Sequence, residues 1–176
     1  MHSILIAGFG GQGVLFAGKV LSYIGLSLGQ EVTWFPSYGP EMRGGTANCS
    51  VNISPNKIGS PMVTKPNVLI VLNNPSYDKF FNAVAVNGKA FVDKSIVDVE
   101  HKRSDIDIFD IDATKICLNE ELKGLGNLVL VGKMLKETNL GTVEIAKSAI
   151  EKSMTSKKPH LLELNKKAVE LGYTTV

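Results

Sequence analysis

The feature that most constrains the fold is the segment Gly8-Phe9-Gly10-Gly11-Gln12-Gly13, which directly follows an apolar run over residues 4–7. An apolar, helix-patterned segment over residues 14–28 comes next. A buried strand, a glycine turn and a helix start form one side of the nucleotide-binding crevice of layered α/β proteins. Glycines let the backbone approach a ligand or a packed neighbour, and the free N–H groups of the helix start hold an anion. The sequence therefore predicts an α/β fold with such a turn after its first strand.

Composition is that of an ordinary globular chain. Of its 176 residues, 44% are apolar and 20% charged, and the formal net charge is +2. These values predict a single domain over residues 1–176 with a hydrophobic core. The one tight basic cluster, His101-Lys102-Arg103, is predicted to be a solvated loop, which disfavours nucleic-acid binding. Because polar residues interrupt the apolar segment over residues 14–28, we expect no membrane span and a cytoplasmic location.

Hydrophobic periodicity and turn residues predict alternating strands and helices. Strands are predicted over residues 3–7, 31–35, 46–54, 68–72, 90–93 and 106–111. Helices are predicted over residues 13–28, 74–84, 113–122, 127–138, 142–154 and 159–171, the last ending at Gly172. This order indicates an α/β fold: a Rossmann-like layered sheet with flanking helices and a helical C-terminal part.

Some local details follow from single residues. Gly18 and Gly25 lie on one stripe of the first helix and indicate close packing against a neighbouring backbone. The strand over residues 46–54 alternates in polarity, which predicts that it is half-buried, and the aspartates over 106–111 are typical of a strand near an edge. Asn74 is predicted to cap the helix that follows it.

The glycine turn lacks the other parts of a nucleotide site. Three glycines have the G-x-G-x-x-G spacing of dinucleotide-binding turns, namely Gly8, Gly10 and Gly13. That fingerprint also needs an acidic residue at the end of the second strand, where residues 33–37 contain none. A phosphate loop over residues 13–19 fails because Val20 stands where a Ser or Thr must bind Mg²⁺. Both an NAD or FAD site and an ATPase or kinase function are therefore disfavoured.

Catalytic and metal signatures are also missing. His2, His101 and His160 are scattered, and none lies beside a Cys or Ser in a known nucleophile motif. Cys49 and Cys117 are far apart with no Cys-x-x-Cys pairing, which argues against a zinc site or an iron–sulfur cluster held by this chain. Each cysteine is predicted to be a small buried apolar residue.

The segment from Ser37 to Gly45 is the second candidate for function. It carries Tyr38, Glu41 and Arg43 among three glycines, and it follows the predicted second strand. Loops beyond the carboxyl ends of strands line the crevice of open α/β sheets, so this loop is expected beside the glycine turn. Arg43 then clamps a phosphate or carboxylate; alternatively it pairs with Glu41 and the loop docks on another subunit. Both interpretations stay open.

These two glycine-rich segments, residues 6–13 and 37–45, resemble those of the gamma subunit of 2-oxoacid:ferredoxin (acceptor) oxidoreductases. The version over residues 36–49 is most similar to the 2-oxoglutarate and branched-chain members. The resemblance covers essentially the whole chain and continues through residues 58–61, 74–80, 132–135, 163–168 and 172–173. Residues 123–128 depart from the pattern that is usual in the family.

The resemblance implies a subunit of a larger enzyme. The family oxidatively decarboxylates a 2-oxoacid with coenzyme A, which gives an acyl-CoA, CO₂ and reduced ferredoxin. Thiamine diphosphate would be held by alpha and beta subunits, and iron–sulfur clusters by beta or delta. This chain would be an accessory that binds none of these alone and is inactive in isolation. Its implied partners are the alpha, beta and delta subunits, and ferredoxin or a similar acceptor through the complex, with no nucleic acid and no membrane span.

The expected substrate is 2-oxoglutarate, with branched-chain 2-oxoacids or pyruvate as alternatives. Coenzyme A carries phosphates that suit the N–H groups of the glycine turn and the guanidinium of Arg43. The residues expected to bind it are Gly8, Gly10, Gly11, Gln12, Gly13, Ser37, Tyr38, Arg43, Gly44 and Gly45. No catalytic or metal-binding residue is expected. The competing interpretation is a purely structural assembly subunit in which the same glycines permit tight packing.

Overall fold

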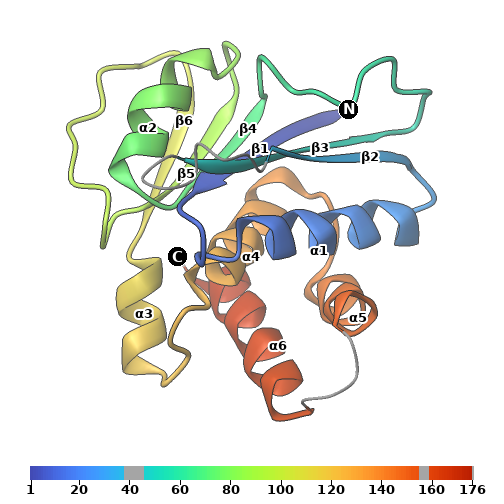
Figure 1. Ribbon diagram of the computed structural model, residues 1–176, viewed down its shortest axis with the longest axis vertical. Coiled ribbons are helices and arrows are strands. Elements are labelled where there is room, and N and C mark those ends of the chain that lie inside the picture. Colours follow the sequence, from blue (N-terminus) through green and yellow to red (C-terminus); the bar gives the residue numbers. More distant parts are fainter. Residues whose placement is uncertain (38–45, 155–158, 176) are drawn as a thin grey trace.

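The computed structural model describes residues 1–37, 46–154 and 159–175 (Figure 1). The strands are β1 (His2–Gly8), β2 (Glu31–Ser37), β3 (Ala47–Ser54), β4 (Val68–Val71), β5 (Lys89–Asp93) and β6 (Asp107–Ile111). The helices are α1 (Val14–Ser27), α2 (Asn74–Phe80), α3 (Ala113–Asn119), α4 (Gly126–Thr138), α5 (Val143–Ser153) and α6 (Pro159–Thr174), with the short 3₁₀ helix η2 (Phe81–Ala83) after α2. The predicted α/β class and helical C-terminal part are confirmed.

The six strands form one mixed sheet in the order β2-β3-β1-β4-β5-β6. β1, β4, β5 and β6 are parallel, whereas β3 runs antiparallel to both β1 and β2. β3 therefore occupies the place beside β1 that the second strand takes in a Rossmann sheet. β2 and β6 form the two edges, which confirms the edge position predicted for residues 106–111.

Helices cover the two faces of the sheet unequally (Figure 1). α1 and α3–α6 lie on one face, and α2 lies on the other. β1 shows how one strand serves both layers: Ile4 and Ile6 join the core under the helical layer, and Leu5 joins the core under α2. This alternation follows from the two-residue period of a strand, and every one of these side chains is buried.

Glycines bring several elements into close contact. A Cβ atom on Gly18 would collide with Sγ of Cys49 in β3, and one on Gly25 would lie 2.7 Å from Val32 in β2. The close packing predicted from these two glycines is confirmed, but the neighbours are side chains and not a backbone as predicted. Gly172 was predicted to end the last helix, but it lies inside α6. A Cβ atom there would collide with the backbone of Val129 in α4. Tertiary packing therefore explains a glycine that resembles a helix stop.

Two other local predictions are corrected. The cap of α2 is Asn73, whose Oδ1 accepts from the N–H of Ser76 at 2.9 Å, and Asn74 already lies in the first turn. β3 is buried on both faces, not half-buried, because the segment after it folds back over its polar face. There the Oγ atom of Ser50 accepts from the N–H of Val63 at 3.1 Å, so these polar groups are buried with partners.

Candidate functional site

The glycine turn between β1 and α1 adopts a backbone that favours glycine. Gly11 has φ 95° and Gly13 has φ 71°, both in the left-handed region. The N–H of Gln12 donates to the carbonyl of Phe9 at 3.2 Å, which closes the turn. Gly8 is needed for space, since a Cβ atom there would lie 2.7 Å from Oε1 of Gln12. These predicted site residues therefore share one compact turn at the carboxyl end of β1.

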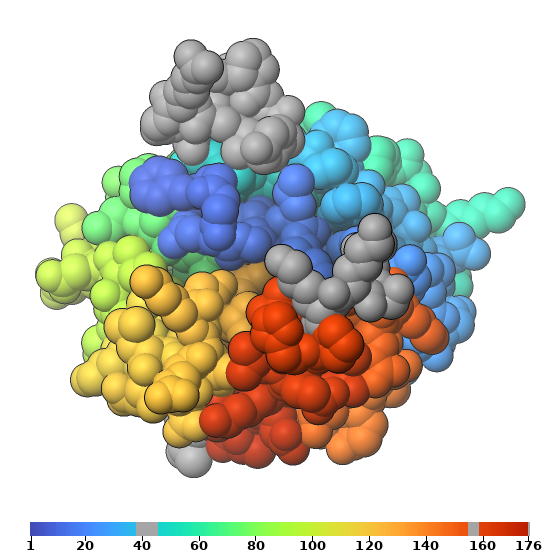
Figure 2. Space-filling view, turned by 60° about the horizontal axis from the view of Figure 1, so that its bottom comes forward, coloured from blue at the N-terminus to red at the C-terminus, as the bar shows by residue number. Residues whose placement is uncertain are grey.

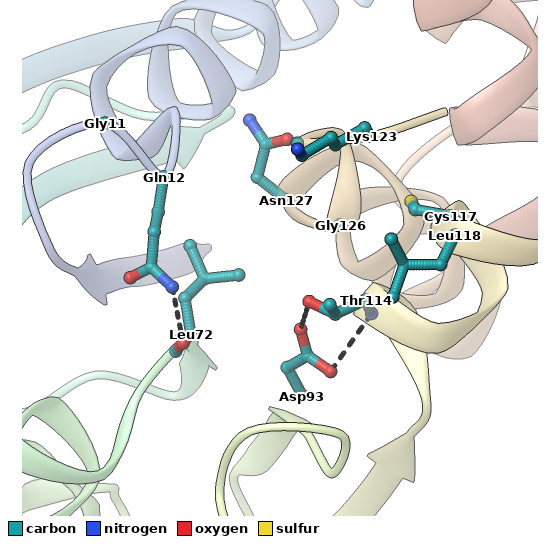
Figure 3. A pocket seen from close by; sticks show the side chains of 11 residues that line it. Gly11, Gln12, Leu72, Asp93, Thr114, Cys117, Leu118, Lys123, Gly126 and Asn127 are labelled. Atoms are coloured by element: carbon teal, nitrogen blue, oxygen red, sulfur yellow. Dashed lines mark hydrogen bonds between the residues drawn. The ribbon is translucent and has the colours of Figure 1, made fainter. Parts of the chain in front are cut away.

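The side chain of Gln12 holds this turn in place. Its Oε1 accepts from the N–H of Phe9 at 2.6 Å and from Nδ2 of Asn73 at 3.1 Å. Its Nε2 donates to the carbonyl of Leu72 at 2.9 Å, as Figure 3 shows. The amide group is thus engaged within the protein and fastens the turn to the carboxyl end of β4. Gln12 therefore stabilises the turn, and its contact with a ligand stays a prediction.

A cavity of about 270 Å³ opens beside the turn, at the carboxyl ends of β1, β4 and β5 (Figure 3). Figure 2 shows the two regions that flank it, the N-terminal segment in dark blue and the segment around residues 114–127 in yellow and gold, next to each other on one face. The lining residues are Gly11, Gln12, Leu72, Asp93, Thr114, Cys117, Leu118, Lys123, Gly124, Gly126 and Asn127. A crevice beyond the carboxyl ends of strands is the usual ligand position in open α/β sheets.

Asn127, in the first turn of α4, has an unused acceptor at this cavity. The residue is only 3% exposed, and its Nδ2 donates to the carbonyl of Gly13 at 3.0 Å. Its Oδ1 is buried and has no hydrogen-bond partner among the described residues. Because buried polar atoms are nearly always paired, this unpaired oxygen distinguishes Asn127 from the other lining residues. The contact also accounts for Gly13, where a Cβ atom would collide with this side chain.

The opposite wall of the cavity is held by a buried carboxylate. Asp93, at the end of β5, accepts from Oγ1 of Thr114 at 2.6 Å and from the N–H of Thr114 at 3.2 Å (Figure 3). Cys117 lies one turn further along α3 and is 2% exposed. Burial, followed by the negative charge of Asp93, raises the pKa of the Cys117 thiol to about 11, so it is a neutral thiol at pH 7. Burial likewise raises the pKa of Cys49 to about 12, and the prediction of two buried cysteines is confirmed.

A second cavity, of about 260 Å³, lies on the other side of the turn. Its lining is Phe9, Gly10, Gly11, Gly13, Val14, Leu15, Phe16 and Ala47. The N–H of Ala17 donates to Gly13 at 2.9 Å, so the N–H groups of the three preceding residues have no acceptor within the helix. The positive end of the α1 dipole faces the same space. This side of the turn suits an anion, and Gly11 borders both cavities.

The predicted neighbourhood of turn and loop can be followed up to the ends of the loop. Ala47, at the start of β3, pairs with Gly8, and Ser37, at the end of β2, pairs with Asn48. Ser37 and the glycine turn therefore lie at the same end of the sheet. The other predicted loop residues, Tyr38, Glu41, Arg43, Gly44 and Gly45, fall outside the described residues. Their binding role stays a prediction.

A hydrogen-bonded chain that the sequence did not suggest lies under α2. The hydroxyl of Tyr77 is 2.8 Å from Nδ1 of His101, and Nε2 of His101 is 2.8 Å from Asp110 in β6. The His101 ring also stacks on Phe81, with ring centroids 5.7 Å apart. Burial raises the pKa of Tyr77 to about 12, with smaller effects from nearby aspartates.

Residues 101–103 were predicted to form a solvated loop, and this prediction is wrong. His101 takes part in the chain just described, and the guanidinium of Arg103 donates to the carbonyl of Val84 at 2.8 Å. Arg103 also pairs with Asp105 at 2.6 Å. These contacts tie the segment between β5 and β6 to α2 and η2, so two of the three basic residues serve the fold.

The described ranges hold neither a cluster of metal ligands nor a membrane-spanning helix. Residues 1–37, 46–154 and 159–175 contain no group of three or more His, Cys, Asp or Glu side chains placed to hold a metal ion. Within the same part of the chain, no helix combines the length and the apolar character needed to cross a bilayer.

Comparison with known proteins assigns the chain to a family. The family model described as pyruvate ferredoxin/flavodoxin oxidoreductase matches residues 3–175. The chain belongs to this family. A solved family member, the gamma subunit of keto/oxoacid ferredoxin oxidoreductase from Geobacter sulfurreducens, superposes with a TM-score of 0.82 at 26% identity and covers 98% of this chain and 96% of its own. The resemblance seen in the sequence is confirmed.

Two curated relatives differ in length. Ketoisovalerate oxidoreductase subunit VorA of Methanothermobacter marburgensis is 34% identical over 169 residues, which are 96% of this chain and 35% of VorA. 2-oxoglutarate synthase subunit KorC of Methanocaldococcus jannaschii is 33% identical over 174 residues, 97% of this chain and 91% of KorC. The chain thus spans about a third of VorA and nearly all of KorC. The same family unit forms part of a long polypeptide in one relative and almost the whole of the other.

Sequence reasoning found the turn but missed the residues that face it. Asp93 carried a signal, since it ends a predicted strand, and carboxyl ends of strands are where ligand sites form. Little in the sequence points to Asn127, because it lies 114 positions after Gly13, in a segment that departs from the family pattern. Only the packing of α4 against the start of α1 brings it to the site.

Proposed function

We propose that this chain is the gamma component of a coenzyme A-dependent 2-oxoacid:ferredoxin oxidoreductase, with 2-oxoglutarate as the first candidate substrate. The observation that carries this proposal is the family match over residues 3–175, together with the end-to-end correspondence to the 2-oxoglutarate synthase subunit KorC. Ketoisovalerate and pyruvate are the alternative substrates, because VorA and the 28% identical pyruvate synthase subunit PorC of Thermotoga maritima are also relatives.

The chain's own contribution is to help bind coenzyme A at the glycine turn. The N-terminus of α1 offers free N–H groups and a positive dipole end to a phosphate. Gly11 keeps the backbone open to such a group, Gly13 adopts the left-handed conformation at the start of α1, and Gln12 holds the turn rigid. The unused Oδ1 of Asn127 offers an acceptor to an N–H or O–H of the same ligand. Each of these features fits a phosphate-bearing ligand with amide and amine donors.

The chemistry itself is assigned to partner subunits. Thiamine diphosphate and iron–sulfur clusters would supply the decarboxylation and the electron transfer there. The two cysteines of this chain lie on β3 and α3 and are buried, so they offer no ligand set for a cluster. This chain would position coenzyme A as an accessory, together with alpha, beta and delta subunits and a ferredoxin-type acceptor.

A purely structural role is the second candidate, and specific contacts favour it. The side chains of Gln12 and Asn127 both form hydrogen bonds that hold the turn. Gly18 and Gly25 allow α1 to pack closely on the sheet. In this alternative, the loop over residues 37–45 docks on another subunit and coenzyme A is bound elsewhere.

A pull-down of the tagged chain from its own host tests the main proposal. We expect co-purification of a thiamine diphosphate and iron–sulfur complex that oxidises a 2-oxoacid in a coenzyme A-dependent assay with a viologen dye. The preferred 2-oxoacid names the enzyme. Recovery of the chain alone, without this activity, would overturn the proposal.

Arg43→Ala separates the ligand role from the structural one. If Arg43 binds a phosphate of coenzyme A, the assembled enzyme keeps its subunits, and its KM for coenzyme A rises about tenfold, the loss of about 1.4 kcal/mol. If the loop docks on a partner, assembly fails instead. Lys57→Ala, in the exposed turn after β3, is the matched control and should change neither property.

A further inference from the structure

The two edges of the sheet differ sharply in character. β2 pairs with β3 alone among the strands of the described residues, and β6 pairs with β5 alone. β6 is a charged edge: its Asp107 pairs with Lys89 at 2.6 Å, and its Asp110 is bound by His101 at 2.8 Å. Charged side chains and a covering segment are common ways to protect an edge strand from pairing with another chain.

Among the described residues, no residue of β2 takes part in an ion pair. Trp34 and Phe35 point to opposite faces of this strand and are 42% and 37% exposed. Glu31, at the start of the strand, is its only charged residue. A seven-residue edge strand with two exposed aromatic side chains is an exposed apolar edge, which marks a site of association in a natural protein.

Two further exposed apolar side chains directly adjoin, in sequence, residues that pack against β2 or β3. Leu26 of α1 is 57% exposed and follows Gly25, which packs against Val32 of β2. Met62 is 56% exposed and precedes Val63, whose N–H is bound to Ser50, the register partner of Phe35. We call Leu26, Trp34, Phe35 and Met62 the β2 surface. Aromatic residues and Met are enriched at protein interfaces.

We propose that the β2 surface is where this chain docks onto the catalytic polypeptide that corresponds to the remaining two thirds of VorA. This inference rests on the proposed function. VorA carries the family unit in 35% of its length, whereas KorC is almost wholly accounted for by it. A unit that is covalently joined to a larger chain in one relative needs a non-covalent surface in the other. The β2 surface supplies an apolar one, and β6 does not.

Photo-crosslinking in the native complex tests this placement without disturbing the surface. A photoreactive phenylalanine analogue replaces Phe35 in the tagged chain expressed in its own host. The control carries the same analogue in place of Val86, a 63% exposed residue between η2 and β5. We expect position 35 to cross-link to the larger catalytic polypeptide and position 86 not to do so. Cross-linking only from position 86, or from position 35 to a second copy of this chain, overturns the inference.

A variant pair gives an independent measurement. The double substitution Leu26→Lys with Phe35→Lys places two charges on exposed positions of the β2 surface, and Val86→Lys is the control. Because charges are excluded from interface cores, we expect recovery of the catalytic polypeptide to fall at least about tenfold with the double variant and to stay unchanged with the control. Circular dichroism of each purified variant confirms the fold.

The outcomes separate the two proposals. If the unmodified chain recovers the active complex and the double variant recovers it equally well, the docking inference is wrong and the proposed function stands. If the unmodified chain recovers no such complex, the proposed function fails and the docking inference fails with it.

Discussion

Glycine serves two regions of this chain in different ways. In the turn over residues 8–13, Gly11 and Gly13 have positive φ, and a Cβ atom on Gly11 would meet nothing within 4 Å. Where α4 crosses α6, Gly132 and Gly172 have ordinary helical backbone, and a Cβ atom on either would collide with the backbone of the other helix. Gly11 is needed for its backbone conformation and lies beside open space, whereas Gly132 and Gly172 are needed for the close approach of two helix backbones. The first kind is compatible with a ligand site, and the second belongs to the core.

The largest effect is expected at the crossing. Gly172→Ala would force α6 away from the backbone of Val129, which cannot move aside as a side chain can. We expect a loss of at least about 3 kcal/mol in the free energy of unfolding, which exceeds the helix-propensity gain of about 1 kcal/mol. Urea denaturation measures it. Gly59→Ala, where a Cβ atom meets nothing within 4 Å, is the control, and equal stability of the two variants would contradict the packing argument.

A smaller loss of stability is expected in the turn, with a different functional consequence. Gly11→Ala keeps open space around the new methyl group but places alanine at φ 95°, which costs about 1 to 2 kcal/mol. Because Gly11 borders both cavities, we also expect the KM for coenzyme A in the assembled enzyme to rise on the order of tenfold. The distinction between the turn and the α4–α6 crossing is wrong if Gly11→Ala loses as much stability as Gly172→Ala, or if it binds coenzyme A normally.

The smallest effect is expected in the alkylation rates of the two cysteine thiols. These rates compare a residue beside a cavity with a residue in the closed core. Cys117 lines a cavity and has a pKa of about 11, whereas Cys49 lies beneath α1 with a pKa of about 12. We expect slow alkylation at pH 8 that speeds up about tenfold per pH unit, with Cys117 modified before Cys49. Mass spectrometry of iodoacetamide-treated protein measures both rates, and Cys117→Ser identifies the first site. Faster reaction at Cys49 would contradict the assignment.

The same pKa values set the sign of a stability change. Burial raises both thiol pKa values above the unfolded value of 9.0, so the folded state holds these protons more tightly than the unfolded chain does. Their contribution to stability is complete below about pH 9 and is lost as the pH rises toward 11 and 12.

Local pattern was a good guide to which elements form. Each predicted strand and helix has a counterpart, because burial repeats every two residues in a strand and every three to four in a helix. The buried cysteines and the packing glycines of α1 followed from residue chemistry in the same way. Three errors lay where another segment changed the environment: the covered polar face of β3, the glycine inside α6, and the hydrogen-bonded His101. The fourth error was local, since the cap of α2 is Asn73 and not Asn74.

The sequence by itself thus determined the order of the elements, the glycine turn after β1 and, through its motifs, the family. Only the tertiary structure decided that β3 lies between β2 and β1, and that Asn127 of α4 meets Gly13 with one acceptor left over. The physical reason is the range of the interactions. Helix, strand and turn preferences act over a few neighbouring residues, whereas strand pairing and helix packing join segments that may be a hundred residues apart and leave no periodic trace in either one.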